Sequence, residues 1–218
     1  MNRLIILTIL FTGLISCNQN EIKIIDKPID FSENRVGLTL DYIGDHYSIY
    51  PKDIKIEPEI IVLHWTESND FEKSFNIFKP EKIQYGGIVA HASQLNVSIH
   101  FLVDRDGTIY RLMPETWMAR HVIGLNYHSI GVENVGGKGA IDNMTKEQVD
   151  ANIKLVRYLA KKYPTIEYLI GHYEYTDFED TRFWMEKDST YRTVKTDPSE
   201  AFMAKVREAT EYLDLQKL

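Results

Sequence analysis

The sequence predicts a single α/β domain in which a mixed central β-sheet is flanked by helices. Its 218 residues are enough for one domain of ordinary size with short extensions. Hydrophobic residues make up 44% of the chain and charged residues 26%, as in globular proteins and unlike disordered ones. Short aliphatic runs alternate along the chain with helix-like patterns, and this alternation is typical of a sheet covered by helices.

The first residues have the features of an export signal. Arg3 is followed by an uncharged apolar stretch over residues 4–16. This stretch is shorter than the about 20 apolar residues that a membrane-spanning helix needs. Residues 14–17, Leu-Ile-Ser-Cys, resemble a lipobox, in which the cysteine becomes the acylated first residue of a lipoprotein. We expect a signal peptide over residues 1–16 and a lipid on Cys17; the alternative is that Cys17 is an apolar residue of an uncleaved anchor.

Lipidation would place the protein in the cell envelope. Acyl chains tether a soluble domain to a membrane without inserting it, so we expect a lipid-anchored lipoprotein at the periplasmic face or in the outer membrane. Residues 17–56 are polar and are interrupted by Pro28 and Pro51. We interpret them as a tether and an irregular N-terminal extension, followed by one domain over residues 57–218.

Five segments predict the strands of the sheet. Residues 60–63 form a continuous aliphatic run, as expected for a strand that is buried on both faces. Residues 97–103 and 108–112 flank an Asp-Arg-Asp-Gly segment, whose glycine suits the tight turn of a hairpin. Two further short strands are predicted over residues 129–133 and 167–170.

Helix signals lie between and after these strands. The clearest helix begins at Thr145, where the sequence Thr-Lys-Glu-Gln fits a capping box, and it ends before Pro164. A last helix is predicted to start after Pro198, because proline suits the first turn of a helix. A shorter helix is predicted near residues 71–78.

Charge and cysteine content exclude several classes of function. The net charge of −7 argues against nucleic acid as a partner, because an acidic protein repels phosphate backbones. The single cysteine excludes a disulfide within the chain and a site built from several thiolates. A metal ion would therefore be held by histidine and carboxylate side chains. The sequence lacks the His-Glu-x-x-His motif of many metallopeptidases, so a general exported metallopeptidase is not supported.

Three polar side chains stand where an α/β sheet tends to place its functional groups. His64 and His172 each directly follow a predicted strand, and functional groups of open α/β sheets gather at the carboxyl ends of strands. A histidine in such a position, taken alone, is more often a hydrogen-bonded structural residue than a metal ligand. Asp197, in the sequence Lys-Thr-Asp-Pro, precedes the last predicted helix and could be its N-cap instead.

Four motifs in this order resemble those of zinc-dependent N-acetylmuramoyl-L-alanine amidases, the family that includes the peptidoglycan recognition proteins. Residues 61–66 (IVLHWT) look like the opening motif, and residues 97–110 (VSIHFLVDRDGTIY) are similar to the central hairpin. Residues 126–134 (NYHSIGVEN) are similar to the strand that bears an acidic residue. Residues 171–172 and 195–198 resemble the segments with the closing ligands. The resemblance implies an amidase fold.

The resemblance covers roughly residues 59–213 and implies a metal-dependent hydrolase. It implies that Zn²⁺ is held by His64, His172 and Asp197, with water in the open fourth position. The implied reaction is hydrolysis of the amide bond between N-acetylmuramic acid and L-alanine, in peptidoglycan or its muropeptide fragments. We expect the protein to act as a monomer.

The resemblance also implies roles for three further residues. Glu133 matches the acidic residue that takes a proton from water and passes it to the leaving amine. Lys195 matches the position that stabilises the oxyanion. His121 falls where relatives carry a histidine on the substrate side. Trp65 is a candidate for a wall of the substrate groove, but aromatic residues next to strand ends more often belong to the core.

One departure from the family pattern concerns the carboxylate ligand. His172 and Asp197 are separated by more residues than is usual in the family, and the residues between them, 174–193, are rich in acids and aromatics. We interpret this segment as a loop insertion that shapes the groove or forms a lid. Its acids offer alternatives to Asp197 as the third ligand, namely Asp177, Glu179 and Asp180. The alternative function is a module that binds cell-wall fragments without cutting them.

Overall fold

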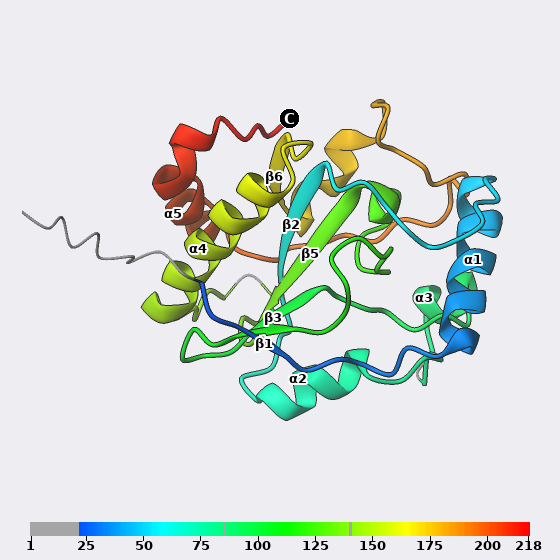
Figure 1. The fold of residues 1–218 in the computed structure, drawn as a ribbon, viewed down its shortest axis with the longest axis horizontal. Coiled ribbons are helices and arrows are strands. Elements are labelled where there is room, and N and C mark those ends of the chain that lie inside the picture. Colours follow the sequence, from blue (N-terminus) through cyan, green and yellow to red (C-terminus); the bar gives the residue numbers. More distant parts are fainter. Residues whose placement is uncertain (1–21, 85, 140) are drawn as a thin grey trace, which may run out of the picture.

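The computed structural model describes residues 22–84, 86–139 and 141–218, which form a six-stranded sheet with the order β1-β4-β3-β5-β2-β6 (Figure 1). Strands β3 and β4 are antiparallel, and the other neighbouring strands are parallel. The predicted mixed sheet is therefore confirmed. In chain order the strands are β1 (Ile24–Asp26), β2 (Ile60–Trp65), β3 (Phe101–Val103), β4 (Ile109–Arg111), β5 (Ser129–Asn134) and β6 (Tyr168–Gly171).

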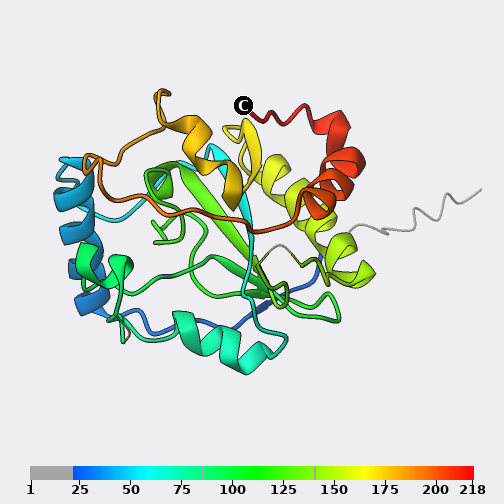
Figure 2. The same cartoon turned by 180° about the vertical axis from the view of Figure 1, so that it is seen from behind.

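Helices surround the sheet (Figures 1 and 2). The α-helices are α1 (Glu33–Tyr47), α2 (Phe71–Phe78), α3 (Ile88–Ala92), α4 (Lys146–Lys162) and α5 (Glu200–Thr210). Three short 3-10 helices are η1 (Asn126–His128), η2 (His172–Phe178) and η3 (Glu211–Leu213). Across residues 22–84, 86–139 and 141–218, no helix has both the length and the apolar character needed to cross a membrane. The expected signal peptide and Cys17 lie outside the described residues.

Strand β2 lies inside the sheet and is buried along its whole length. Because side chains alternate along a strand, Ile61 and Leu63 point to one face, where they pack with residues of α4 and α5. Ile60 and Val62 point to the other face and pack against a second cluster of buried residues. The prediction of a strand buried on both faces is confirmed, and His64 follows on the face that α4 and α5 leave open.

The helices predicted from cap signals are confirmed. Thr145 is the N-cap of α4 in a capping box with Gln148, and the helix ends two residues before Pro164. Burial of Leu155 holds this helix on the sheet, and Leu155→Ala would cost about 2–5 kcal/mol of stability. Helix α2 covers the predicted residues. Helix α5 follows Pro198, but its N-cap is Ser199.

The predicted hairpin is present, with strands shorter than expected. Strands β3 and β4 pair around a turn that contains Gly107, which has a φ of 83°. A Cβ atom at Gly107 would lie 2.7 Å from the carbonyl oxygen of Glu147, so the close approach of α4 requires glycine here. Residues 97–100 are not part of the strand, and the N–H of Ser98 instead bonds the carbonyl oxygen of Arg120.

The described part of the N-terminal extension differs from the irregular tether that its polar composition suggests. Strand β1 pairs in parallel with β4, and α1 is a 15-residue helix capped by Ser32. The helix is not evident from the hydrophobic pattern of the sequence, because its buried side includes a charged residue, Arg35, beside apolar ones. The guanidinium of Arg35 donates to several backbone carbonyl oxygens, and this pairing makes its burial tolerable.

Candidate active site

The three side chains predicted as metal ligands converge at the carboxyl ends of β2 and β6, with His64 inside β2 and His172 directly after β6. His64 Nδ1 lies 2.9 Å from His172 Nδ1. Asp197 Oδ2 lies 3.2 Å from His172 Nδ1 and 3.5 Å from His64 Nδ1. Both imidazoles therefore direct the same nitrogen at one point beside a carboxylate oxygen. Within the described part of the chain, this trio is a group that could hold a metal ion.

The register of the sheet explains why the two histidines meet. Leu63 of β2 lies beside Gly171 of β6, and the histidines are the next residue on each strand. Because both follow the same alternation, their side chains lie on the same face of the sheet. On the other side of β2, His64 is paired with Glu133 of β5, which brings that carboxylate to the same edge.

Asp197 completes the trio through the segment that precedes α5. Its backbone oxygen accepts from the N–H of Tyr173, which fixes this segment next to His172. The alternative that Asp197 is a helix N-cap is wrong, because Ser199 accepts from the first turn of α5 instead. The other acids considered for the third ligand are exposed, and the carboxylate at the imidazoles is that of Asp197.

Burial and the contacts among the three side chains together determine the protonation states of the trio. Burial lowers the pKa of His64, and it lowers the pKa of His172 to about 4. Burial opposes ionisation of Asp197, yet the adjacent rings of His172 and His64 hold the pKa of this carboxyl below its ordinary value. Neutral imidazoles with an ionised carboxylate are the forms that bind a metal ion.

Glu133 faces the same edge of the sheet without a hydrogen-bond partner. Its side chain is half-buried, and the described residues offer its buried Oε2 atom no donor. Burial, and then the negative charge of Asp197, raises the pKa of Glu133 well above its ordinary value. An unpaired carboxyl group with a raised pKa is typical of a residue that transfers protons.

A cleft of about 470 Å³ opens over the trio, within the usual size range of ligand sites. Glu133 and Lys195 line it together with the three candidate ligands. Lys195 is half-buried, and its positive charge contributes to the lowered pKa of His172. The structure therefore brings all five predicted catalytic and metal-binding residues together. Their roles in a reaction stay predictions.

The two predicted substrate contacts also line the cleft. Trp65 is only 3% exposed, and its indole packs where a Cβ atom on Gly137 would collide with it. His121 is half-buried, and its Nδ1 lies 3.0 Å from His64 Nε2. Contact of either residue with substrate stays a prediction, whereas His121 contacts a candidate ligand directly.

The segment over residues 174–193 is packed onto the domain. Several of its aromatic side chains are buried against the face of β2 that carries Ile60 and Val62. Buried Glu186 accepts a hydrogen bond from His46 of α1, with 2.9 Å between Nδ1 and Oε2. The residues that line the cleft over the trio do not include this segment, so a role for it in shaping the groove stays a prediction.

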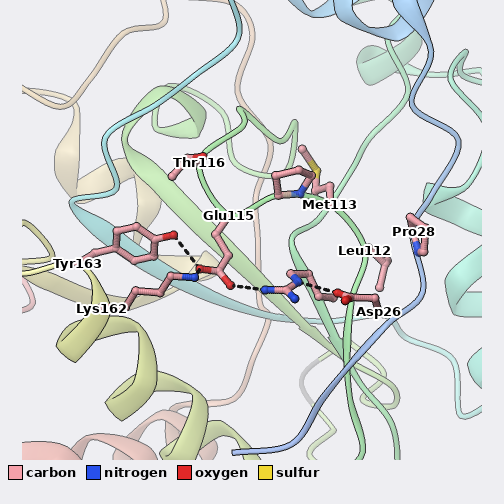
Figure 3. A pocket seen from close by; sticks show the side chains of 10 residues that line it. Asp26, Pro28, Leu112, Met113, Glu115, Thr116, Lys162 and Tyr163 are labelled. Atoms are coloured by element: carbon pink, nitrogen blue, oxygen red, sulfur yellow. Dashed lines mark hydrogen bonds and ion pairs between the residues drawn. The ribbon is translucent and has the colours of Figure 1, made fainter.

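A second hollow, of about 440 Å³, lies where α4 ends (Figure 3). At its centre, Glu115 is 3% exposed and accepts hydrogen bonds from Lys162 Nζ at 2.6 Å, the Tyr163 hydroxyl at 2.7 Å and Arg111 Nη1 at 3.1 Å. Arg111 also donates to Asp26 at 2.7 Å. Since the charged groups that line this hollow pair with one another, its chemistry is structural.

The sequence does not predict that Asn126 and helix α1 lie close to the site. Asn126 Oδ1 accepts from the backbone N–H groups of His121 and Val122, both at 2.8 Å. Its Nδ2 donates to the hydroxyl of Tyr47 on α1 at 2.9 Å. Asn126 lies inside a motif that carries the family resemblance, but no spacing in the sequence connects that motif to α1.

Comparison with known protein families agrees with this geometry. The model of the N-acetylmuramoyl-L-alanine amidase family matches residues 55–200. The chain belongs to this family. The part of the amidase family model that matches includes the three candidate ligands, Glu133 and Lys195, whereas β1 and α1 precede it.

Two similar proteins are phage endolysins. The endolysin of Escherichia phage T7 is 35% identical over 102 residues, which cover 43% of this chain and 67% of the endolysin. The endolysin of Enterobacteria phage T3 is 40% identical over 73 residues, which cover 32% of this chain and 48% of the endolysin. The second match therefore spans about half of that relative.

A similar solved structure is the N-acetylmuramoyl-L-alanine amidase LysC from Clostridium intestinale URNW. The TM-score is 0.51 at 23% sequence identity, and the likeness covers 86% of this chain and 99% of that one. At this identity the likeness shows the fold alone. The predicted amidase-like α/β fold is confirmed.

Proposed function

We propose that this protein hydrolyses the amide bond between N-acetylmuramic acid and L-alanine in peptidoglycan. The observation that carries the proposal is the convergence of His64, His172 and Asp197 in a cleft that also contains Glu133 and Lys195. Membership of the amidase family supports the same activity.

We propose Zn²⁺ as the cofactor of this site. In a tetrahedral zinc site with bonds of about 2.0–2.1 Å, two ligand atoms lie about 3.3 Å apart. The three donor atoms in this structure are separated by 2.9, 3.2 and 3.5 Å. Two imidazoles and one carboxylate are also a donor set typical of catalytic zinc, because they leave one position open. The residues present therefore fit the ion.

Zinc bound here would supply Lewis acidity to the scissile carbonyl group and the attacking water. Glu133 is placed to accept a proton from that water and to deliver it to the nitrogen of the leaving amine, since its Oε2 atom receives no hydrogen bond from the part of the chain that the structure describes. Lys195 supplies a positive charge on the same cleft, where it stabilises the carbonyl oxygen as negative charge develops.

The proposal is tested by incubating the purified protein with muropeptides and detecting free stem peptides by mass spectrometry. We expect release of peptides with a free L-alanine amino group, loss of this release in a chelator, and recovery when zinc is restored. Cleavage that resists the chelator would contradict the role of the metal. Binding of muropeptides without cleavage in the presence of zinc would instead favour a recognition module.

We further propose that the mature protein is a lipoprotein of the cell envelope, on the basis of residues 1–17 of the sequence. Labelling of growing cells with a tagged fatty acid tests this. We expect the label on the wild-type protein and not on Cys17→Ser. An equally labelled variant would refute lipidation at Cys17.

A further inference from the structure

Both ring nitrogens of His121 are engaged, one of them by a candidate metal ligand. His121 Nδ1 lies 3.0 Å from His64 Nε2, and His121 Nε2 lies 3.1 Å from the hydroxyl of Ser129. The rings of His64 and His121 meet edge to face, with 5.1 Å between their centroids. His121 therefore contacts the ring of His64 at Nε2, whereas Asp197 lies at the other ring nitrogen, Nδ1.

The directions of these hydrogen bonds form one consistent series. When His64 Nδ1 is used to bind a metal ion, the N–H of the neutral ring lies on Nε2, which is placed to donate to His121 Nδ1. His121 then donates from Nε2 to Ser129, whose hydroxyl donates to a backbone carbonyl oxygen at 2.8 Å. Each donor in this series meets an acceptor, and the tautomer of His64 in the series is the one that leaves Nδ1 available to a metal ion.

The backbone of His121 is held in turn by Asn126. This side chain accepts from two successive backbone N–H groups and donates to the hydroxyls of Tyr47 at 2.9 Å and Tyr42 at 3.4 Å. Asn126, Tyr42 and Tyr47 are each 1% exposed. The contacts from α1 to Asn126 thus lie in the interior, where water does not compete for the hydrogen bonds.

Helix α1 also contacts the segment over residues 174–193. His46 bonds Glu186, and its backbone oxygen accepts from the N–H of Lys187 at 2.9 Å. These residues belong to the segment that continues to Lys195 and Asp197. One helix, which lies outside the residues matched by the family model, therefore contacts Asn126, which holds the backbone of His121, and also the segment that leads to Asp197.

We propose that α1 stabilises the metal site through Asn126 and His121. These two are positioning residues that hold the Nδ1 atom of His64 toward the ion. This inference rests on the metal site of the proposed function. Partners that orient metal-bound histidines typically change metal affinity about 10–100-fold when they are removed. We assign His121 a role that acts through His64, in addition to the predicted contact with substrate.

The direct test replaces His121 in the full chain. His121→Phe removes the acceptor for His64 but keeps an aromatic ring, whereas His121→Asn offers a side-chain oxygen near the position of Nδ1. We expect zinc affinity, measured by competition with a fluorescent chelator, to fall about 10–100-fold in His121→Phe and to be largely retained in His121→Asn. Unchanged affinity in His121→Phe, or equal losses in both variants, would overturn the inference.

A second test acts from α1 and avoids the cleft. Tyr47→Phe removes the hydroxyl that Asn126 bonds, and Tyr127→Phe is the matched control, because its ring lies 6.4 Å from that of Tyr47 but does not bond Asn126. We expect Tyr47→Phe, and not Tyr127→Phe, to weaken zinc binding and to alter the visible spectrum of the Co²⁺-substituted protein. Identical affinities and spectra in the two variants would refute the role of α1.

The melting temperature of the zinc-free variants separates positioning from folding. We expect Tyr47→Phe to weaken zinc binding more than Tyr127→Phe when the two metal-free proteins melt at similar temperatures. A wild-type protein that takes up no zinc would refute the proposed function, and the inference with it. A wild-type protein that binds zinc and cleaves muropeptides, with no effect of His121→Phe and Tyr47→Phe, would refute the inference alone.

Discussion

Glu115 and Glu133 lie at opposite ends of the parallel strands, and their surroundings are opposite in kind. Glu133 lies at the edge where β2 and β5 end. Glu115 lies beside the end of α4, which returns the chain from the end of β5 to the start of β6. Three strong donors surround Glu115 (Figure 3). The described residues offer Glu133 Oε2 no donor.

The two environments shift the pKa values in opposite directions. Burial alone would raise the pKa of Glu115, but the hydrogen bonds from Lys162 and Tyr163 outweigh it and lower the pKa. Burial and the charge of Asp197 raise the pKa of Glu133. A buried carboxylate with all its partners stabilises a fold, whereas one that lacks partners in a cleft is available for chemistry.

Replacement of each glutamate by glutamine would distinguish a role in the reaction from a role in stabilising the fold. We expect the largest effect, on kcat, at Glu133. We expect Glu133→Gln to lower kcat for muropeptide cleavage about 10²–10⁴-fold, because the amide cannot transfer the proton. We expect its stability to be unchanged or increased, since no charge is then desolvated. Steady-state kinetics and urea unfolding measure the two effects.

Glu115→Gln is the matched variant with the reverse pattern. We expect it to lose about 2 kcal/mol of stability, less than a fully buried pair would, because Lys162 and Arg111 are 41% and 31% exposed. The folded fraction should keep the wild-type kcat. Full activity in Glu133→Gln, or an inactive but stable Glu115→Gln, would reverse the assignment of roles.

Lys195 tests whether the positive charge of the cleft acts on the reaction and not on the fold. We expect Lys195→Met to lower kcat about 10²–10³-fold, as the loss of one oxyanion donor does elsewhere. Zinc affinity and melting temperature should stay near the wild-type values. Lys205→Met, on the exposed side of α5, is the control and should leave kcat unchanged. Equal kcat values in both lysine variants would remove Lys195 from the mechanism.

The smallest effect concerns the acid dependence of stability. Because the pKa of Glu115 is lower in the folded state than the about 4.3 of an unfolded glutamate, its contribution is complete above that value. The contribution is lost as the pH falls through the folded pKa. We expect the free energy of unfolding, measured in urea at pH 6 and pH 3, to fall less in Glu115→Gln than in the wild type. An identical fall would show that Glu115 is not a linked group.

The elements that the sequence predicts well are those set by local patterns. The aliphatic run of β2 and the capping box of Thr145 depend on neighbouring residues, and both are confirmed. Helix α1 could not be predicted in the same way, because buried Arg35 makes its inner side look polar. The carbonyl groups that pair with Arg35 come from distant segments.

The same distinction between local sequence patterns and contacts from distant segments applies to the candidate site. The positions of His64 and His172 after strands, and the Lys-Thr-Asp-Pro sequence around Asp197, identify the residues that meet at the trio. The contact of His121 with His64 and the support from Asn126 depend on how loops fold back on the sheet. Sequence spacing carries no information on such contacts, so these partners emerge from the structure.

The central claim is that His64, His172 and Asp197 hold one zinc ion on which cleavage depends. The most direct measurement is the zinc content and the muropeptide cleavage of the same samples of wild type and Asp197→Ala, after dialysis against trace zinc. We predict one zinc per wild-type chain with cleavage, and loss of both metal and cleavage in a variant that remains folded. An Asp197→Ala protein that retains its zinc and cleaves at the wild-type rate would contradict the account.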